Sequence, residues 1–358
     1  MFETKEAFRF KICFAVLSSK ELVLKLAEEE LEDYELNFLN LVSVVTKNSK
    51  IFLSNRNRTL NFQPGTLDAR VEDGLEFDCG TSRSVSYYLE PLAMLSLFYK
   101  TVFRIKLTGI TNDSVDLSVD LLKDGLFPLL GKLYPDSVKI SMKVLERGFR
   151  VSGGGAVVFE SVPVKKSLPA MASLPRERLI KRIRGTVTTS KVSTTFLNSM
   201  ILKAREVFND YIPDVWLYSV QVKNSSDHFF GISLHTDTHL VAEHCFDLLT
   251  EPGKVPSPES VAETACLRLL DEIDNASNLV STSFQPILLT LMALSNGRSE
   301  GPSIGRVSEQ TVVTLRLLRD FFGVEFHFKE TFEDDSRPHL VTPLCKGIGL
   351  IKRTTEEL

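Results

Sequence analysis

Residues 84–107 read SVSYYLEPLAMLSLFYKTVFRIKL, and they contain the two kinds of element that recur along the chain. Residues 84–98 carry apolar side chains at helical spacing, which predicts a helix. Residues 102–107 follow at once, and apolar and charged side chains alternate there from Phe103 onward, as in a half-buried strand. A helix followed directly by a strand favours the α+β class, in which helices pack against sheets.

The same order of elements recurs on both sides of this stretch. Further helices are predicted over residues 34–45, 114–133, 284–294 and 308–322. Strands are predicted after them, at residues 50–53, 59–62, 138–145, 156–162, 324–328 and 339–344. In the first half, a helix and a hairpin return roughly every 50 residues without sequence identity between the copies, which indicates a structural duplication.

A different group of elements interrupts this pattern. It consists of a helix at 195–209, strands near 214–222, 231–236 and 239–244, and a helix at 258–273. Because the first pattern resumes after this group, we predict a smaller α/β domain inserted into a larger one. The predicted boundaries are 1–180 and 278–358 for the large domain and 181–277 for the insert.

Composition indicates a folded protein without a general preference for nucleic acid. The 358 residues are 43% hydrophobic, and 42 Lys and Arg against 46 Asp and Glu give a net charge of -4. Five scattered cysteines without a C-x-x-C pair fit a reducing compartment. We expect no signal peptide, because Arg9 and Lys11 interrupt the first apolar stretch and no small-residue cleavage site follows it. We expect no membrane contact, since the most apolar later segment, 287–294, is far shorter than the roughly 20 residues of a membrane span.

Residues 165–191 are strongly basic. They contain eight Lys and Arg residues against one acid, Glu177, which gives this tract a local charge of +7. The tract fits a solvated linker at a domain edge, or a surface that contacts RNA phosphate or an acidic partner. Aromatic residues do not interleave it, so sequence-specific reading of single strands is not expected.

Several short strings follow one another in an order that covers nearly the whole chain. They are Phe62-Gln-Pro-Gly65, Gly80-Thr-Ser-Arg-Ser84, Leu107-Thr-Gly-Ile-Thr-Asn112, Arg147-Gly148 with Gly153-Gly-Gly155, Ile183-Arg-Gly185 with Lys191-Val-Ser193, Ile212-Pro-Asp214 and Lys346-Gly-Ile-Gly349. Through them the chain resembles the RNA 3'-terminal phosphate cyclase superfamily, and more closely its eukaryotic cyclase-like branch. The resemblance implies a large domain of repeated helix-and-sheet units with a smaller insert. It also implies either ATP-dependent cyclisation of RNA ends or a non-catalytic part in pre-ribosomal RNA processing, beside an assembly GTPase.

The cyclase activity that this resemblance implies requires a histidine at or just before the start of the last long helix, where it carries the nucleotide. That stretch reads Gly305-Arg-Val-Ser-Glu-Gln310, and no histidine occurs between His244 and His327. Imidazole is not easily replaced as the carrier of the nucleotide by the side chains of Ser308, Glu309 or Gln310. The glycine-rich string that opens active cyclases is also missing, and residues 28–35 carry six acids, which repel phosphate. We therefore predict no cyclase activity, no catalytic residues and no cofactor.

The residues suggest two other kinds of site, a phosphate-binding or nuclease site and a metal site. Arg316 and Arg319 share a face of the last helix, which fits a solvated surface, a phosphate-binding surface or a nuclease site. Leu317 disfavours the nuclease interpretation, because family members can carry an acidic residue at this position. His235, His239, His244 and Cys245 lie within eleven residues but lack the spacing of a zinc knuckle, so we predict ordinary strand histidines and no metal site.

The main hypothesis is a non-catalytic assembly factor for small-subunit pre-rRNA processing in the nucleolus of the nucleus. Its expected partners are a ribosome-assembly GTPase, pre-ribosomal RNA and the small-subunit precursor particle. The predicted contacts with RNA or phosphate are Arg182, Arg184, Lys191, Arg316 and Arg319. A predicted anion loop combines Arg83 and Ser84 with Gly153, Gly154 and Gly155, although a helix cap and a hairpin turn explain the same residues. The alternative is an RNA-processing enzyme, either a pre-rRNA endonuclease or an RNA 3'-phosphate cyclase.

Overall fold

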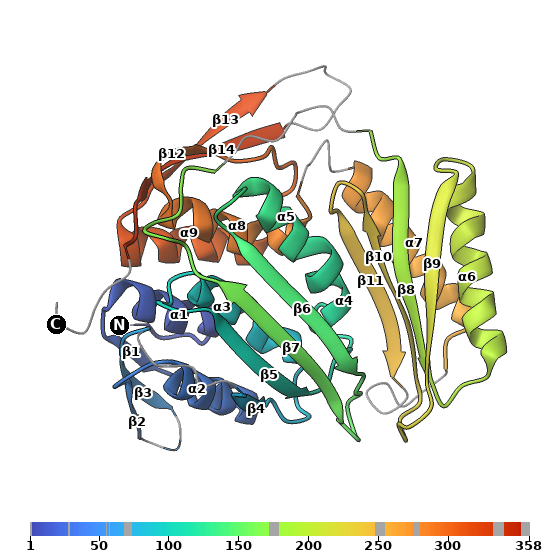
Figure 1. Cartoon of the computed structure of the whole chain (residues 1–358), viewed down its shortest axis with the longest axis horizontal. Coiled ribbons are helices and arrows are strands. Elements are labelled where there is room, and N and C mark those ends of the chain that lie inside the picture. Colours follow the sequence, from blue (N-terminus) through green and yellow to red (C-terminus); the bar gives the residue numbers. More distant parts are fainter. Residues whose placement is uncertain are drawn as a thin grey trace.

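Helices and sheets alternate along the chain, so the predicted α+β class is confirmed. The computed structural model describes residues 2–27, 29–54, 56, 58–67, 74–171, 179–247, 255–274, 280–331 and 340–351. Within these residues one unit occurs three times: a helix, a strand, a second helical segment and a hairpin (Figure 1).

The bounds of the elements follow this repeat. The first unit has α1 (Phe8–Ser18), β1 (Leu22–Lys25), α2 (Asp33–Val45), β2 (Lys50–Ser54) and β3 (Thr59–Gln63). The second has α3 (Val85–Ser96), β5 (Phe103–Gly109), α4 (Val119–Leu121), the π-helical turn η1 (Leu122–Leu126), α5 (Phe127–Leu133), β6 (Lys139–Glu146) and β7 (Gly155–Val162). The third has η2 (Thr282–Phe284), α8 (Gln285–Leu294), β12 (Asn296–Glu300), α9 (Glu309–Phe322), β13 (Phe326–Thr331) and β14 (Leu340–Ile348).

The three units share one sheet topology. Their strand orders are β1-β3-β2, β5-β7-β6 and β12-β14-β13, and every neighbouring pair in them is antiparallel. A short strand, β4 (Glu76–Asp78), adds to the second sheet parallel to β5. The sequence analysis missed β1 and β12, because β1 has only four residues and β12 (NGRSE) is polar.

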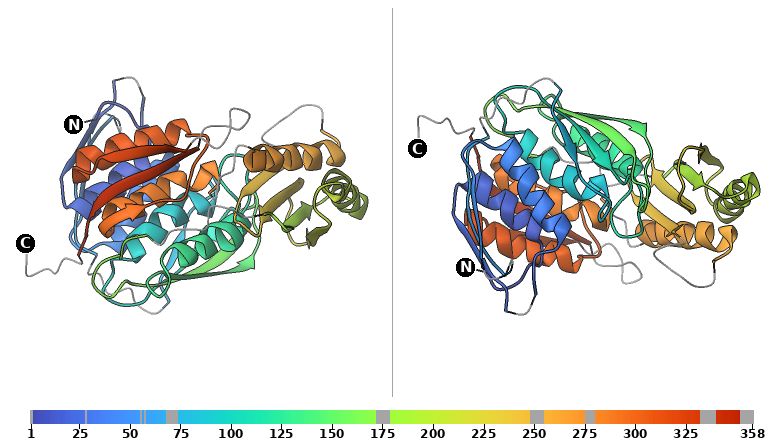
Figure 2. Two further views of the ribbon diagram at one scale, coloured as in Figure 1. Left: turned by 90° about the horizontal axis from the view of Figure 1, so that it is seen from above. Right: turned by 90° about the horizontal axis from the view of Figure 1, so that it is seen from below.

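The first helix of each unit lies in the interior. All ten residues of α8 are buried, and almost all of α1 and α3 are buried as well. A helix that is apolar on every side is typical of such a position. Figure 2 shows these helices gathered between the sheets, and α1 packs against both α3 and α9. The sequence analysis did not predict α1, because charged Arg9 and Lys11 interrupt its apolar run.

Residues 182–274 contain a second hydrophobic core, and we call this part the central unit. It consists of β8 (Arg182–Ser190), α6 (Thr194–Asn209), β9 (Asp214–Val222), β10 (Phe229–Thr236), β11 (Val241–Asp247) and α7 (Pro258–Asp274). Its sheet has the order β11-β10-β8-β9, with β8 and β9 parallel. Helices α6 and α7 cover one face of this sheet, and their apolar residues form the core with it. The domain boundaries at 181 and 277 stay a prediction.

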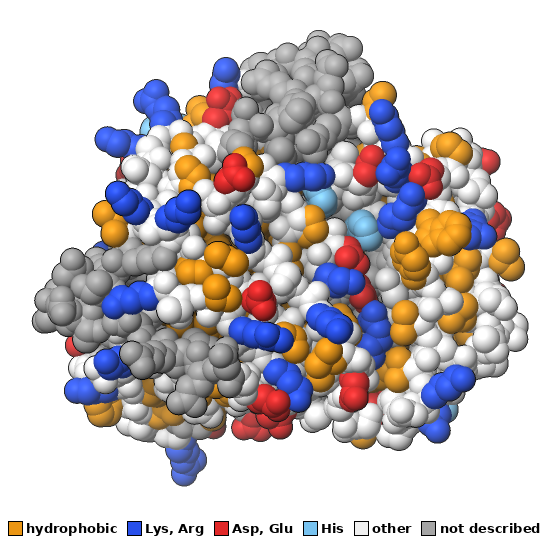
Figure 3. Space-filling view, in the orientation of Figure 1, with side chains coloured by type: hydrophobic (Ala, Val, Ile, Leu, Met, Phe, Trp, Pro, Cys, Tyr) orange, Lys and Arg blue, Asp and Glu red, His pale blue; other side chains and the backbone are white. Residues whose placement is uncertain are grey.

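Part of the basic tract is a strand that the sequence analysis did not predict. Residues 182–190 form β8 inside the sheet, where they pair with β9 on one side and with β10 on the other. The arginines stand at its exposed start, and Figure 3 shows Lys and Arg side chains over that end. Arg176 and Arg178 lie outside the described residues.

Two expected elements begin later than predicted. The helix predicted from residue 114 begins at Val119, because Asp113 accepts hydrogen bonds from the backbone N–H groups of Val115 and Asp116 and holds these residues in a turn. The strand predicted from residue 239 begins at Val241, because His239 has φ 69° and lies in the turn after β10. In the described part of the chain, no helix is long and apolar enough to cross a bilayer.

Candidate active site

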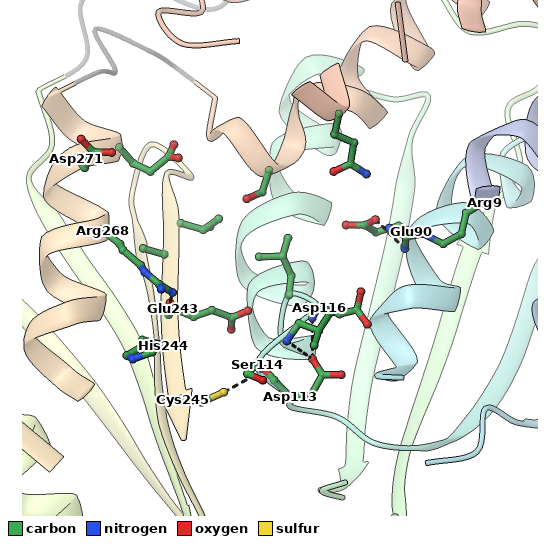
Figure 4. Close-up of a pocket in the computed structure, with 17 residues that line it drawn as sticks. Arg9, Glu90, Asp113, Ser114, Asp116, Glu243, His244, Cys245, Arg268 and Asp271 are labelled. Atoms are coloured by element: carbon green, nitrogen blue, oxygen red, sulfur yellow. Dashed lines mark hydrogen bonds and ion pairs between the residues drawn. The ribbon is translucent and has the colours of Figure 1, made fainter. Parts of the chain in front are cut away.

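A cavity of about 410 Å³ lies where the repeated units and the central unit meet (Figure 4). Its walls come from α1, α3, the loop after β5, β11, α7 and the first turn of α9. In Figure 4, Glu243 and Cys245 of β11 point toward Asp113 and Ser114, while Arg9 and Glu90 form the other side. The cavity thus joins residues that are far apart in the sequence.

Asp113 fixes the loop at the floor of the cavity. Its carboxylate accepts hydrogen bonds from the backbone N–H groups of Val115 at 3.0 Å, Asp116 at 2.7 Å and Ser84 at 3.1 Å. Cys245 donates its thiol hydrogen to the carbonyl of Asp113 at 3.1 Å. The N-terminus of α3, which attracts anions through its dipole, therefore already lies against a carboxylate of the protein itself.

The predicted anion loop is held by protein groups. Ser84 is fully buried and caps α3 by accepting a hydrogen bond from the N–H of Ser86. Arg83 forms a bidentate ion pair with Asp116, at 2.7 and 2.6 Å, and this pairing raises the pKa of the guanidinium against the effect of its burial. Arg83 also stacks over the rings of Tyr34 and Tyr87. The guanidinium of Arg83 therefore already has a carboxylate partner within the protein.

Gly153 and Gly154 lie in the turn before β7, and Gly155 is the first residue of that strand. Gly153 and Gly154 have φ of 57° and 75°, and the N–H of Gly153 bonds to the carbonyl of Phe149 at 2.8 Å. A Cβ atom on Gly153 would lie 3.0 Å from Thr81, so this turn and the loop before α3 are neighbours. The prediction of an anion loop brings together two segments that are close in space, but the anion itself stays a prediction.

A glutamate at the boundary between the units has an unusual environment. Glu243 accepts hydrogen bonds from the N–H of Ser118 at 2.9 Å and from the hydroxyl of Ser233 at 3.2 Å. Burial raises the pKa of Glu243 to about 7, and these hydrogen bonds counteract part of the rise. Glu90 is similar, since burial raises its pKa while Arg9, 3.1 Å away, lowers it. Buried carboxyls of this kind occur in active sites and also in structural networks.

The charge of the cavity is predominantly negative. Two guanidinium groups line it, Arg9 and Arg268, and the first is paired with Glu90. Six carboxyl groups line it: Glu90, Asp113, Asp116, Glu243, Asp271 and Glu272. This excess of carboxyl groups disfavours a polyphosphate, because like charges repel.

Two residues that line the cavity, Gln310 and His244, bear on the histidine that the cyclase reaction requires. Gln310, in the first turn of α9, lines the cavity, and its amide neither attacks phosphorus nor leaves as an imidazole does. His244 also borders the cavity, but Figure 4 shows its ring on the side of β11 opposite to Glu243 and Cys245. Within the described ranges, no group of three or more His, Cys, Asp or Glu side chains is arranged to hold a metal ion.

Comparison with known proteins decides the family. Residues 1–328 match the sequence profile of the family described as RNA 3'-terminal phosphate cyclase. The chain belongs to this family. Within it, the mouse "RNA 3'-terminal phosphate cyclase-like protein" is 35% identical over 328 residues, which cover 89% of this chain and 86% of the relative.

Other members of the cyclase-like branch match over similar lengths. The fission yeast "rRNA processing protein rcl1" is 32% identical over 315 residues, covering 85% of this chain and 83% of the relative. A "Probable RNA 3'-terminal phosphate cyclase-like protein" of Dictyostelium discoideum is 30% identical over 369 residues and covers 97% of both chains. The resemblance to the cyclase-like branch is confirmed.

The arginines predicted to contact RNA lie on two separate surfaces. Arg316 and Arg319 line a groove of about 290 Å³ between α9 and β13, opposite His327. Arg182 and Arg184 stand on β8, where both pair with Asp214 of β9, and Lys191 is exposed in the turn after β8. These contacts with RNA stay a prediction, and Asp214 reduces the local charge that the basic tract indicated.

The sequence analysis missed most residues of the cavity. Asp113, Asp116 and Glu243 belong to no motif, and the carboxylates come together only because β11 packs against the loop after β5. One sequence motif pointed to this region: the string that ends at Asn112, directly before Asp113.

Proposed function

We propose that this chain is a non-catalytic, cyclase-like assembly factor for small-subunit pre-rRNA processing in the nucleolus, acting with a ribosome-assembly GTPase. The observation that carries the proposal is Gln310, which occupies the cavity at the start of α9, where the family chemistry requires a histidine. The excess of carboxyl groups over guanidinium groups in the lining of the cavity also supports a role without a bound nucleoside triphosphate.

The relatives give the direction of this proposal. The fission yeast relative is named for rRNA processing, and the animal relatives are named cyclase-like rather than cyclase. The separate core of the central unit also supports an insert over residues 181–277, which gives the protein two parts for binding RNA and protein partners.

Depletion and replacement test the proposal in cells. Loss of the protein should cause unprocessed small-subunit precursor to accumulate, and both the wild type and Gln310→Ala should restore processing, since Gln310 has no chemical role. Normal precursor levels after depletion would contradict the proposal. Affinity purification should recover a GTPase together with precursor particles.

A second candidate is an endonuclease at the groove between α9 and β13. There Arg316 and Arg319 face His327, so the groove combines two cations for a phosphate with an imidazole that could transfer a proton. Incubation of the purified protein with labelled pre-rRNA would test this candidate. Specific cleavage that His327→Ala abolishes would favour the enzyme over the assembly factor.

A further inference from the structure

The outer face of the central sheet carries exposed aromatic side chains beside arginines. In the parallel pairing of β8 with β9, Arg184 is opposite Trp216 and Thr186 is opposite Tyr218. Residues opposite one another in a sheet project from the same face. Trp216 is 55% exposed and Tyr218 is 58% exposed, whereas Leu217 between them is buried in the core.

This face is covered only in part. At β10 it lies against the second repeated unit, since the Ser233 hydroxyl is 2.8 Å from that of Ser118. At β9 the face is open, whereas Thr188 and Ser190 on β8 are buried. Figure 3 shows a patch of hydrophobic side chains over β9 that Lys and Arg side chains border. Exposed aromatic rings next to each other are unusual on a sheet that has already buried its other face. The open part of the face is therefore available to a ligand.

A groove continues the aromatic patch along β9. Val220 and Val222 follow Trp216 and Tyr218 at alternate positions, and they line a groove of about 450 Å³. The opposite wall comes from β6 and the helical segment before α5, and it contributes Lys123, Lys143 and Arg147 together with the carboxylates Asp120 and Glu146. Arg147 is paired with Asp120 at 2.7 Å, so Lys123 and Lys143 are the cations that a ligand can reach. The groove thus has valines on one side and, on the other, a wall on which three cations outnumber two carboxylates.

The charges on this surface favour a polyanion. Arg182 and Arg184 both pair with Asp214, at 3.4 and 2.9 Å, and Asp237 also lies near Arg184. The side chain of Arg182 is 64% exposed, so it is accessible to a ligand. Lys143 is exposed on β6. Cations that follow a line of stacking rings match the alternating phosphates and bases of a single strand.

We propose that single-stranded RNA binds along β9, with bases stacked on Trp216 and Tyr218 and with phosphates contacted by Arg182, Arg184 and the lysines of the groove. The rings accept any base, so the binding has little sequence preference. This inference rests on the proposed function, because it names the surface through which an rRNA-processing factor contacts its RNA. It also changes the interpretation of the basic tract, since sheet pairing supplies the aromatic residues that the tract lacks.

The chain offers a direct probe of this site, because Trp216 is its single tryptophan. Titration of the full-length protein with oligouridylate at low salt should quench its tryptophan fluorescence saturably. In parallel, anisotropy of a labelled oligouridylate should show about a tenfold loss of affinity for Trp216→Ala and a similar loss for Tyr218→Ala. Trp216→Phe keeps a ring and should retain most of the affinity. Phe52→Ala, at a ring that is also 55% exposed but lies on β2, is the matched control and should bind like the wild type.

The possible results distinguish a failure of this RNA site from a failure of the proposed function. Binding with unchanged fluorescence and equal affinity for all variants would overturn the site and leave an RNA-binding factor that uses another surface. Absence of any binding to single strands would also overturn it, and would assign the aromatic face to a protein partner. Precursor accumulation after depletion is measured independently, so the proposed function can fail or stand by itself. Circular dichroism checks that each variant is folded.

Discussion

Replacement of Glu243 by Gln is expected to stabilise the fold by an amount that grows with pH. Burial raises the pKa of this carboxyl from 4.5 to about 7. Between these values the folded protein retains a proton that the unfolded chain has released, so the stability of the wild type falls as the pH rises through this window. Each unit of the shift corresponds to about 1.4 kcal/mol, which gives a cost of about 3 kcal/mol for the whole shift.

Glutamine keeps the shape of the side chain and an oxygen that accepts from Ser118 and Ser233, but it does not ionise. We therefore expect Glu243→Gln to be about 1 kcal/mol more stable than the wild type near pH 5 and about 3 kcal/mol more stable near pH 8. Urea unfolding followed by circular dichroism across this range measures the difference. Glu300→Gln, at an exposed carboxyl on β12, is the control and should show no such trend. A difference for Glu243→Gln that is constant with pH would refute the argument from burial.

Three further predictions concern other parts of the molecule. Arg147→Ala should lower the free energy of unfolding by about 3–5 kcal/mol, because it leaves Asp120 buried without its bidentate partner at 2.7 Å. The double variant Arg147→Ala with Asp120→Ala should lose less stability than Arg147→Ala alone. An equal loss in the single and the double variant would contradict the pairing. Gly148→Ala should prevent stable folding in urea titrations, since its Cβ would lie 2.2 Å from the nitrogen of Gly155. Gly154→Ala, at φ 75° and with open space around the Cβ, should lower the free energy of unfolding by only about 1–2 kcal/mol. Gln310→His should not acquire a covalent AMP adduct from labelled ATP, because the carboxylates around it still repel the triphosphate; a stable adduct would show that the histidine alone is missing.

The elements that the sequence predicted well have strong local patterns. The helix capped by Ser84 and the hairpins of residues 50–63 and 139–162 lie within a few residues of their predicted positions, because apolar periodicity and turns are local properties. The missing histidine at the start of α9 is likewise visible in the sequence alone. Family membership follows from short strings that are spread over the whole chain.

The contacts between those elements, and the sites that they form, depend on the tertiary structure. The strand β8 was hidden in the basic tract, because its pairing with β9 and β10 rather than its own composition makes it a strand. The same pairing places Trp216 beside Arg184 and gives Asp214 two arginine partners, contacts between residues about 30 positions apart that no local pattern records. The carboxylates of the cavity come from four separate segments, and their pKa values depend on burial, which exists only after these segments have packed together.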